Sequence, residues 1–185
     1  MAGRRRTIDR DKVLDAAEAV VTRTGAAGLT IDAVAREAGI TKGGVQYCFG
    51  SKESLIGAML NRWGDSFERD VMEHAGEEPS AEDIVRGHIE ASRKTDDTED
   101  SRSAVMMTAL LQSPEQIAET RAWYNSRLAG LDLKSTAGRR ARLAFLASEG
   151  AFFLRAFNLL DMDEQDRQVL FDDIAGLLAP EKTDS

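Results

Sequence analysis

Hydrophobic residues recur at helical spacing along nearly the whole chain, and the interruptions between these stripes predict where helices begin and end. One stripe covers residues 9–24 and stops at Gly25, and two short stripes follow over residues 30–38 and 42–48. Gly39 and Thr41 lie between the two short stripes, in positions that favour a helix C-terminus and a helix N-cap. Two short helices joined by so short a turn predict a helix-turn-helix, whose second helix enters the major groove of DNA.

Later stripes predict a larger helical region, so we expect an all-α chain with about nine helices in total. Ser51 would cap a long fourth helix that reaches about His74, and an acidic connector is expected over residues 94–101. The remaining helix signals are Ser80 with Asp83, the Ser-Pro-Glu-Gln run at 113–116, and apolar stripes over about 136–160 and 163–178.

The residues around the predicted helix-turn-helix form a longer pattern. It consists of Leu29–Ile31, Val34–Ala35, Ala38–Gly43, Tyr47, Phe49 and Lys52–Leu55. In these positions, which span roughly the first third of the sequence, the chain resembles the amino-terminal domain of TetR/AcrR-type transcriptional regulators. The resemblance implies a dimeric, all-helical repressor that a small molecule releases from DNA. It also implies a DNA-binding domain over residues 7–67 and a ligand-binding and dimerisation domain over residues 68–185, with the long fourth helix shared between them.

Eight residues of this segment are candidate DNA contacts: Thr30, Thr41, Lys42, Gly43, Gly44, Gln46, Tyr47 and Lys52. The resemblance implies phosphate contacts for Thr30, Tyr47 and Lys52, although Thr30 also suits a helix cap. Gln46 stands where many relatives carry an aromatic residue, and its amide has the geometry to read adenine. Gly43 and Gly44 either let the backbone approach DNA closely or belong to a frayed first turn.

Other residues near this segment keep two interpretations each. Val45 can pack inward or meet a thymine methyl group. Cys48, where many relatives carry a histidine, is either a packed residue or a thiol switch close to DNA. Arg4, Arg5 and Arg6 form either an arm that reaches phosphates or a minor groove, or a solvated terminus.

The predicted helix over residues 136–160 is apolar on two faces, and such a helix must be buried on both. Either it is a deep core helix of one chain, or one face pairs with a second copy. The resemblance favours the second interpretation, because the last two helices of the family pair in a dimeric four-helix bundle. The residues expected at this interface are Leu143, Leu146, Ala147, Gly150, Leu154, Phe157, Leu170, Ile174 and Leu177.

Aromatic and methionine side chains on several predicted helices form a candidate ligand pocket, although such residues also fill ordinary cores. The candidates are Met59, Trp63, Phe67, His88, Met106, Leu110, Trp123, Tyr124, Glu149, Phe152 and Phe153. Glu149 lies in an apolar stretch where an unpaired carboxylate is costly, so Arg127, Arg155 or a cationic ligand should pair with it. His88 is expected to be a hydrogen-bonded core histidine.

Composition and charge narrow the class of protein. The 185 residues are 42% hydrophobic and include one cysteine, with no apolar run long enough to span a membrane and no signal peptide, so we expect a cytoplasmic protein. The net charge of −8 divides into +3 over residues 1–52 and −11 over residues 53–185. A basic first segment suits DNA phosphates, although a basic tail beside an ordinary acidic surface would carry the same charge.

Catalytic, cofactor and metal sites are not expected. The two histidines are too few for a multi-histidine metal site, which leaves one histidine with carboxylates as the alternative, and the sequence has no glycine-rich phosphate loop. We therefore expect a repressor rather than an enzyme, with double-stranded operator DNA, a second copy of the chain, and an apolar or cationic small-molecule inducer or corepressor as partners. The resemblance points toward control of an efflux or detoxification gene. The alternative is a helical protein-interaction module whose helix-turn-helix no longer binds DNA.

Overall fold

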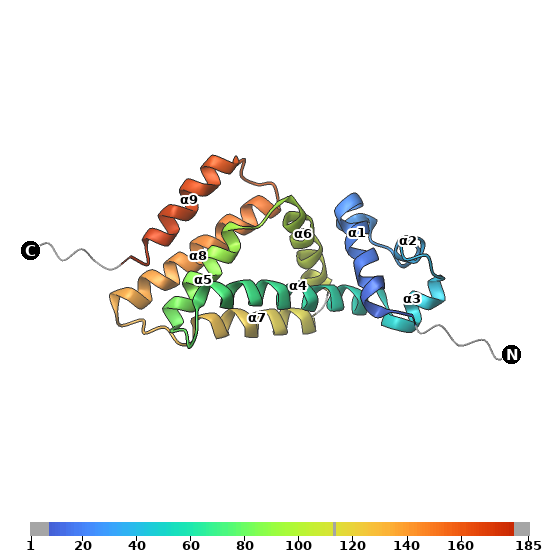
Figure 1. The fold of residues 1–185 in the computed structure, drawn as a ribbon, viewed down its shortest axis with the longest axis horizontal. Helices are drawn as coiled ribbons and strands as arrows, with labels where there is room; N and C mark the ends of the chain where they lie inside the picture. Colours follow the sequence, from blue (N-terminus) through green and yellow to red (C-terminus); the bar gives the residue numbers. More distant parts are fainter. Residues whose placement is uncertain (1–7, 113, 180–185) are drawn as a thin grey trace, which may run out of the picture. The chain divides into compact units, whose positions relative to one another are not determined.

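The computed structural model describes residues 8–112 and 114–179, and this part of the chain forms nine α-helices and no strand (Figure 1). The all-α fold that the apolar periodicity predicts is therefore confirmed. None of the helices described is both long and apolar enough to cross a bilayer. In chain order the helices are α1 (Arg10–Gly28), α2 (Ile31–Glu37), α3 (Lys42–Phe49), α4 (Lys52–Ala75), α5 (Ala81–Arg93), α6 (Asp97–Gln112), α7 (Pro114–Leu128), α8 (Thr136–Ala156) and α9 (Glu164–Gly176).

The chain divides into two compact units, neither of which is continuous in sequence. The first unit contains Met1–Trp63 and Ser101–Ser113, and the second contains Gly64–Asp100 and Pro114–Ser185. The division falls twice inside a helix, after Trp63 of α4 and after Asp100 of α6. Both α4 and α6 therefore contribute residues to each unit.

The core of the first unit forms where the apolar stripe of α1 meets α2, α3 and the beginning of α4. Val20, Val34 and Val45 are each at most 1% exposed, and α6 adds Val105 and Ala109 to the same core. Burying one aliphatic side chain of this size stabilises a fold by about 1.5–3 kcal/mol. Because α2 and α3 are too short to be stable alone, this packing rather than helix propensity holds them in place.

Two glycines interrupt the helices of the first unit where the sequence predicts breaks. Gly25 adopts φ 68° inside α1, so the helix is kinked there and a short helical segment continues to Gly28. Gly39 adopts φ 65° directly after α2. Glycine has no Cβ and reaches this left-handed region without the steric cost that other residues meet.

The second unit is built around α5, which packs against α7, α8 and α9. Its apolar face carries Val85 and Ile89, both fully buried, which meet Phe145 of α8 and Phe171 of α9 in one core. His88 lies on the same helix and is 1% exposed. The core thus fixes a histidine in the interior of this unit.

Two predicted boundaries were wrong. The connector expected over residues 94–101 is shorter, because α6 already begins at Asp97. Helix α8 ends at Ala156 rather than near Leu160, since Asn158 adopts φ 52°, which no right-handed helix accommodates. The predicted cap at Ser113 and the arginine arm at residues 4–6 lie outside the described residues.

Candidate DNA-binding and ligand-binding sites

Two threonines fix the geometry of the helix-turn-helix. The Thr30 hydroxyl accepts a hydrogen bond from the backbone N–H of Ala33 at 3.1 Å, and so caps α2. The Thr41 hydroxyl accepts one from the N–H of Gly44, also at 3.1 Å, and caps α3. Each cap satisfies a backbone donor that the first helical turn would otherwise leave unpaired. Both threonines are candidate DNA contacts, and in the structure their hydroxyls already act as caps.

Helix α3 has an inner and an outer face. Val45 is fully buried and Phe49 is 6% exposed, with the Arg10 guanidinium 4.6 Å above the Phe49 ring. On the outer face Tyr47 is 85% exposed. The other exposed residues of this face are Lys42, Gly43 and Gln46. One side of α3 therefore anchors the helix and the other offers a cation, an amide and a phenol to a partner.

The two glycines of α3 differ in their surroundings. A Cβ on Gly43 would meet only the Thr41 hydroxyl, at 3.9 Å, so this position is open. A Cβ on Gly44 would lie 3.0 Å from the Ile8 Cδ1 atom and 3.4 Å from the Ile40 Cδ1 atom. Gly44 therefore faces the core of its own unit, and its proposed role as a DNA contact through a missing side chain is wrong. A Cβ at this position would press on the Ile8 Cδ1 atom.

The cationic side chains of this region have different environments. The Lys42 ammonium pairs with the Asp32 carboxylate of α2 at 2.9 Å, with both side chains more than half exposed. Lys52 is half-buried at the first position of α4. An exposed ion pair contributes at most about 1 kcal/mol, so Lys42 can exchange Asp32 for a phosphate at little cost. Cys48 is half-buried in α3.

The predicted pocket residues are divided between the two units. In the first unit Met59 is fully buried in the core, Trp63 donates a hydrogen bond to Glu18 at 2.9 Å, and Met106 is half-buried. The side chain of Leu110 lies outside the described residues. The second unit holds Phe67, His88, Trp123, Tyr124, Glu149, Phe152 and Phe153.

Glu149 is the centre of a polar contact among three helices of the second unit. One carboxylate oxygen lies 2.8 Å from Nε2 of His88 on α5, and the other accepts a hydrogen bond from the Tyr124 hydroxyl of α7 at 2.5 Å. The prediction that Arg127 or Arg155 pairs with Glu149 was wrong. Arg127 pairs with Glu68 instead, and Arg155 donates to the Thr95 hydroxyl at 2.8 Å. The predicted hydrogen-bonded core histidine at position 88 is confirmed.

Aromatic rings surround this contact. The His88 ring centroid lies 5.1 Å from that of Phe67, 6.0 Å from Trp123 and 4.7 Å from Phe145. Burial raises the pKa of Tyr124 above its ordinary value, and the charge of Glu149 and the hydrogen bond to it act in the same direction. The phenol therefore remains a hydrogen-bond donor to the carboxylate at any physiological pH.

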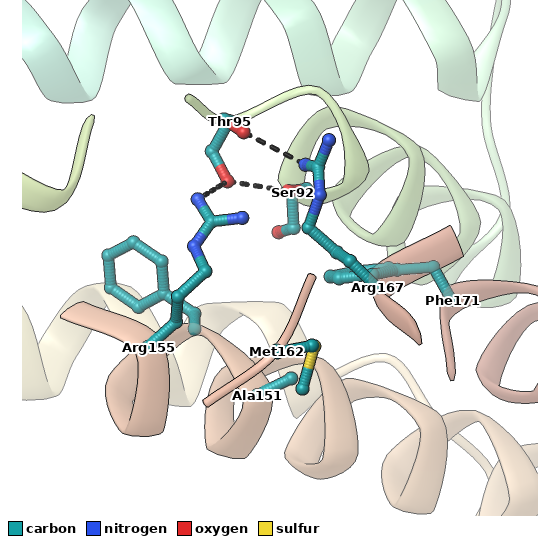
Figure 2. A pocket seen from close by; sticks show the side chains of 8 residues that line it. Ser92, Thr95, Ala151, Arg155, Met162, Arg167 and Phe171 are labelled. Carbon is teal, nitrogen blue, oxygen red and sulfur yellow. Dashed lines mark hydrogen bonds between the residues drawn. The ribbon is translucent and has the colours of Figure 1, made fainter. Parts of the chain in front are cut away.

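A small, shallow hollow lies elsewhere in the second unit, between the end of α5, α8 and α9 (Figure 2). Its apolar walls are Ala151, Phe152, Met162 and Phe171. Arg155 and Arg167 border it, and both guanidiniums donate to Thr95 (Figure 2). Phe152 thus lines this hollow, and Phe153 contacts the Phe152 ring at 5.4 Å between centroids.

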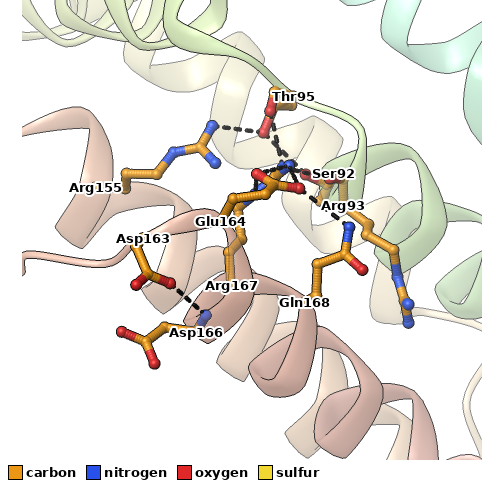
Figure 3. A network of polar contacts seen from close by, with 9 residues as sticks. All are labelled: Ser92, Arg93, Thr95, Arg155, Asp163, Glu164, Asp166, Arg167 and Gln168. Atoms are coloured by element: carbon orange, nitrogen blue, oxygen red, sulfur yellow. Dashed lines mark hydrogen bonds and ion pairs between the residues drawn. The ribbon is translucent and has the colours of Figure 1, made fainter.

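Polar contacts of Arg167 tie α9 to the end of α5 (Figure 3). Its guanidinium donates to the backbone carbonyl oxygens of Arg93 and Thr95 and to both carboxylate oxygens of Glu164. Gln168 also donates to Glu164, at 3.0 Å. The charge of Arg167 is therefore matched within the unit, which gives this guanidinium a structural role.

The residues predicted at a dimer interface have unequal exposure. Leu143 and Leu146 of α8 are 55% and 53% exposed, and Leu154 and Phe157 are 41% and 42% exposed. Ile174, by contrast, is 3% exposed inside the core of its own unit, so its assignment to an interface was wrong. Of the remaining candidates, Ala147 and Leu177 are exposed, and Gly150 and Leu170 are half-buried.

A compact helical unit that contains a helix-turn-helix, joined to a second and larger helical unit, defines a class of DNA-binding transcriptional regulator. Residues 13–59 match the family of bacterial regulatory proteins described as the tetR family, and residues 82–179 match the tetracyclin repressor-like C-terminal domain. The second match alone spans more than half of the chain. The chain belongs to the TetR family of transcriptional regulators.

Curated relatives match part of the chain. The HTH-type transcriptional regulator SrpR and the uncharacterized HTH-type transcriptional regulator TtgW, both of Pseudomonas putida, are each 33% identical over 82 residues, or 44% of this chain. These residues cover 38% of SrpR and 61% of TtgW. The matched segment thus spans less than two thirds of either relative.

Solved structures show the same fold over most of the chain. A transcriptional regulator from Rhodococcus sp. Rha1 superposes with a TM-score of 0.68 at 16% identity, covering 92% of this chain and 96% of the other. The multidrug binding protein EbrR in complex with malachite green superposes with a TM-score of 0.63 at 25% identity, covering 92% and 98%. EbrR in complex with imidazole gives 0.64 at 23% identity, covering 95% and 98%.

Proposed function

We propose that the protein is a dimeric transcriptional repressor that binds a palindromic operator and leaves it when a small molecule binds. The observation that carries the proposal is the outer face of α3, where Lys42, Gly43, Gln46 and Tyr47 are exposed on a helix held rigidly by Thr41 and Val45. A short exposed helix of this kind fits the width of a major groove.

The charges and donors of this face suit a duplex. Lys42 and Lys52 would meet phosphates, the Tyr47 hydroxyl would donate to a phosphate oxygen, and the Gln46 amide would read a base edge. Gly43 is open, so the backbone can approach DNA there. Phosphate contacts would position the helix, and Gln46 would provide specificity at one base pair.

Dimerisation would place two copies of α3 on one face of the operator. Leu143, Leu146 and Leu154 of α8 and Phe157 at its C-cap leave about half of their surface exposed, which is a large apolar area for one helix. Covering these side chains with the same helix of a second copy would remove them from water and form a symmetric interface. Two recognition helices would then meet half-sites about 34–36 Å apart or a multiple of that distance.

A small molecule would act by binding one conformer of the dimer better than another, and its differential affinity sets how far the equilibrium shifts. The second unit supports a ligand with its aromatic rings around Glu149, and EbrR, of the same fold, is described as a multidrug binding protein. Control of an efflux or detoxification gene is consistent with such a ligand.

Binding to the DNA upstream of the chain's own gene tests the proposal. Fluorescence anisotropy with a labelled duplex of that region should give an affinity at least ~10³-fold tighter than for a shuffled duplex of equal composition. The logarithm of the affinity should fall linearly with the logarithm of the salt concentration. Equal, weak binding to both duplexes would favour the alternative, a helical interaction module whose helix-turn-helix does not bind DNA.

A further inference from the structure

The charged side chains of the helix-turn-helix cancel one another. Residues 30–50 contain two cations, Arg36 and Lys42, and two carboxylates, Asp32 and Glu37, so their formal charge is zero. A surface that binds DNA gains its sequence-independent affinity from cations, because each neutralised phosphate releases condensed counterions. The segment proposed to enter the groove therefore has no excess of positive charge of its own.

The one charged residue of α3 is already paired within the protein. Helix α3 reads Lys-Gly-Gly-Val-Gln-Tyr-Cys-Phe, so Lys42 is its only cation. The Lys42 Nζ donates a hydrogen bond to Oδ2 of Asp32 on α2 at 2.9 Å. Both side chains are more than half exposed, so solvent and solutes can reach the pair. The positive charge of the recognition helix is thus matched by a carboxylate before any DNA arrives.

The fold of the helix-turn-helix does not depend on this ion pair. Val34 of α2 and Val45 of α3 are fully buried in the core of their unit, and a threonine caps each helix. Burial of two such side chains contributes far more to stability than one exposed ion pair, which is worth about fivefold in an equilibrium constant at most. The effect of the pair therefore falls on the charge of the surface that DNA would meet.

The second carboxylate of the segment has a partner elsewhere. Glu37 of α2 accepts a hydrogen bond from the Arg23 guanidinium of α1 at 2.7 Å. This pair joins α1 to α2 and includes no residue of α3. Of the two carboxylates, Asp32 alone is paired with a residue proposed to contact DNA, and Glu37 is a matched comparison on the same helix.

A duplex that uses Lys42 has to displace Asp32. The ammonium leaves the carboxylate for a phosphate, so the free energy of the ion pair is lost on binding. Each α3 that enters a groove therefore binds about twofold to fivefold more weakly than it would without the pair. The released carboxylate then lies close to phosphates of the same sign, and this repulsion acts in the same direction.

We propose that Asp32 is an intramolecular competitor of the DNA phosphates for Lys42, and that it holds the operator affinity below the value that α3 could reach. The inference rests on the proposed function and specifies how the affinity of the same site is set. Asp32 acts through Lys42 and needs no contact with DNA. A lower operator affinity has a regulatory consequence, because a ligand with a smaller difference in affinity between the two conformers is then enough to release the protein.

Removal of the carboxylate tests the competition. Fluorescence anisotropy of the full chain is measured on the labelled upstream duplex between about 50 and 200 mM salt. Asp32→Asn should bind about twofold to fivefold more tightly for each α3 in the complex, with a salt slope close to that of wild type. Lys42→Ala should bind more weakly, with a slope smaller by about 0.9 for each α3. An unchanged or weaker affinity in Asp32→Asn would overturn the inference.

A double-mutant cycle separates competition from simple repulsion. In a Lys42→Ala background, Asp32→Asn should lose most of its gain in affinity, because no ammonium is left to release. An equal gain with and without Lys42 would show that the carboxylate only repels phosphates, and would overturn the inference.

The matched control is Glu37→Gln, which removes the same charge from the same helix but releases Arg23 of α1. Its affinity for the upstream duplex should stay within about 1.5-fold of wild type. A gain equal to that of Asp32→Asn would show that net charge alone sets the affinity, and would overturn the inference.

Two further measurements keep the result unambiguous. Circular dichroism checks that the variants are folded, and Asp32→Ala, which removes the carboxylate with a strong helix former, should reproduce the gain of Asp32→Asn. A wild-type protein that binds the upstream duplex and a shuffled duplex equally weakly would contradict the proposed function and this inference with it. A wild type that prefers the upstream duplex, with both Asp32 variants unchanged, would overturn the inference alone.

Discussion

Gly87 of α5 lies directly against the backbone of α4 at Val71. A Cβ built on Gly87 would come within 2.3 Å of the Val71 carbonyl oxygen and 3.0 Å of the Ala75 amide nitrogen. Both neighbours are backbone atoms, which cannot move aside as a flexible side chain can. The close approach of these two helices within the second unit therefore depends on the absence of a side chain at position 87.

Replacing this glycine should destabilise the protein. Gly87→Ala is expected to lower the free energy of unfolding by about 1–3 kcal/mol, because α5 must shift away from α4. The measurement is urea unfolding followed by circular dichroism. The control is Gly64→Ala in α4, where a Cβ meets nothing within 4 Å, and where alanine should stabilise the helix by about 0.5–1 kcal/mol. Equal stability of Gly87→Ala and wild type would contradict the close approach.

Gln46 and Lys52 should have different effects on DNA binding. Gln46→Ala is expected to cost about 1–3 kcal/mol of discrimination at one base pair, because it removes a base-edge contact. Lys52→Ala should weaken binding to every sequence alike and reduce the slope of the salt dependence by about one. Anisotropy titrations against single-base variants of the operator, at several salt concentrations, measure both. A uniform loss of affinity in Gln46→Ala would show that this residue does not read a base.

The exposed apolar face of α8 should be needed for dimerisation. Leu146→Glu is expected to give a folded monomer with little operator affinity, because a charge would be buried between the two copies. Sedimentation equilibrium gives the mass, and circular dichroism checks the fold. Leu111→Glu is the control: Leu111 is 81% exposed on α6 and its replacement should leave a dimer. A dimer in both variants would assign the interface to another surface.

The N-terminus of α5 should contribute a pH-dependent part of the stability. The Ser80 hydroxyl lies 2.6 Å from the Asp83 carboxylate, and this hydrogen bond, helped by one from the Ser80 N–H, lowers the pKa of Asp83 below its ordinary value. A lowered pKa in the folded state means that the contribution is present above the unfolded pKa of about 3.9 and is lost as the pH falls through the folded pKa.

Two variants measure this contribution. Asp83→Asn should be less stable than wild type by ~1 kcal/mol at pH 7, and the difference should shrink as the pH falls from about 5 to about 2. Ser80→Ala should show the same trend, because it removes the hydroxyl from the same carboxylate. Denaturant unfolding at pH 7, 4 and 2.5 tests it. A difference that stays constant with pH would mean that the Asp83 charge plays no part.

Local chemistry allowed the helix-turn-helix to be predicted closely. Each of these local features, the caps at Thr30 and Thr41 and the break at Gly39, depends only on residues within four positions of it. The sequence therefore contains all the information needed to predict them. The exposed and buried faces of α3 also follow from its spacing. The direction in which Gly44 faces could not be predicted from the spacing of α3. It depends on Ile8, which precedes α1 in the sequence and packs against Gly44.

The contacts around Glu149 could not be predicted from the sequence. Its partner His88 is 61 positions away and Tyr124 is 25 positions away, so the pairing depends on how α5, α7 and α8 pack. The sequence did indicate that a carboxylate in an apolar stretch needs a partner. It favoured an arginine because arginines lie nearby in the chain, whereas the three-dimensional packing brings an imidazole and a phenol.

The return of α6 to the first unit limits how the protein can be dissected. A fragment that stops at Trp63, or at the expected domain end near residue 67, would lack Val105 and Ala109 and leave a void in the hydrophobic interior of the first unit. Spectroscopic or crystallographic work on the isolated first unit would need residues 101–112 to be joined to residues 1–63 through an engineered linker. The residues of the two units thus alternate along the polypeptide and do not form two consecutive domains.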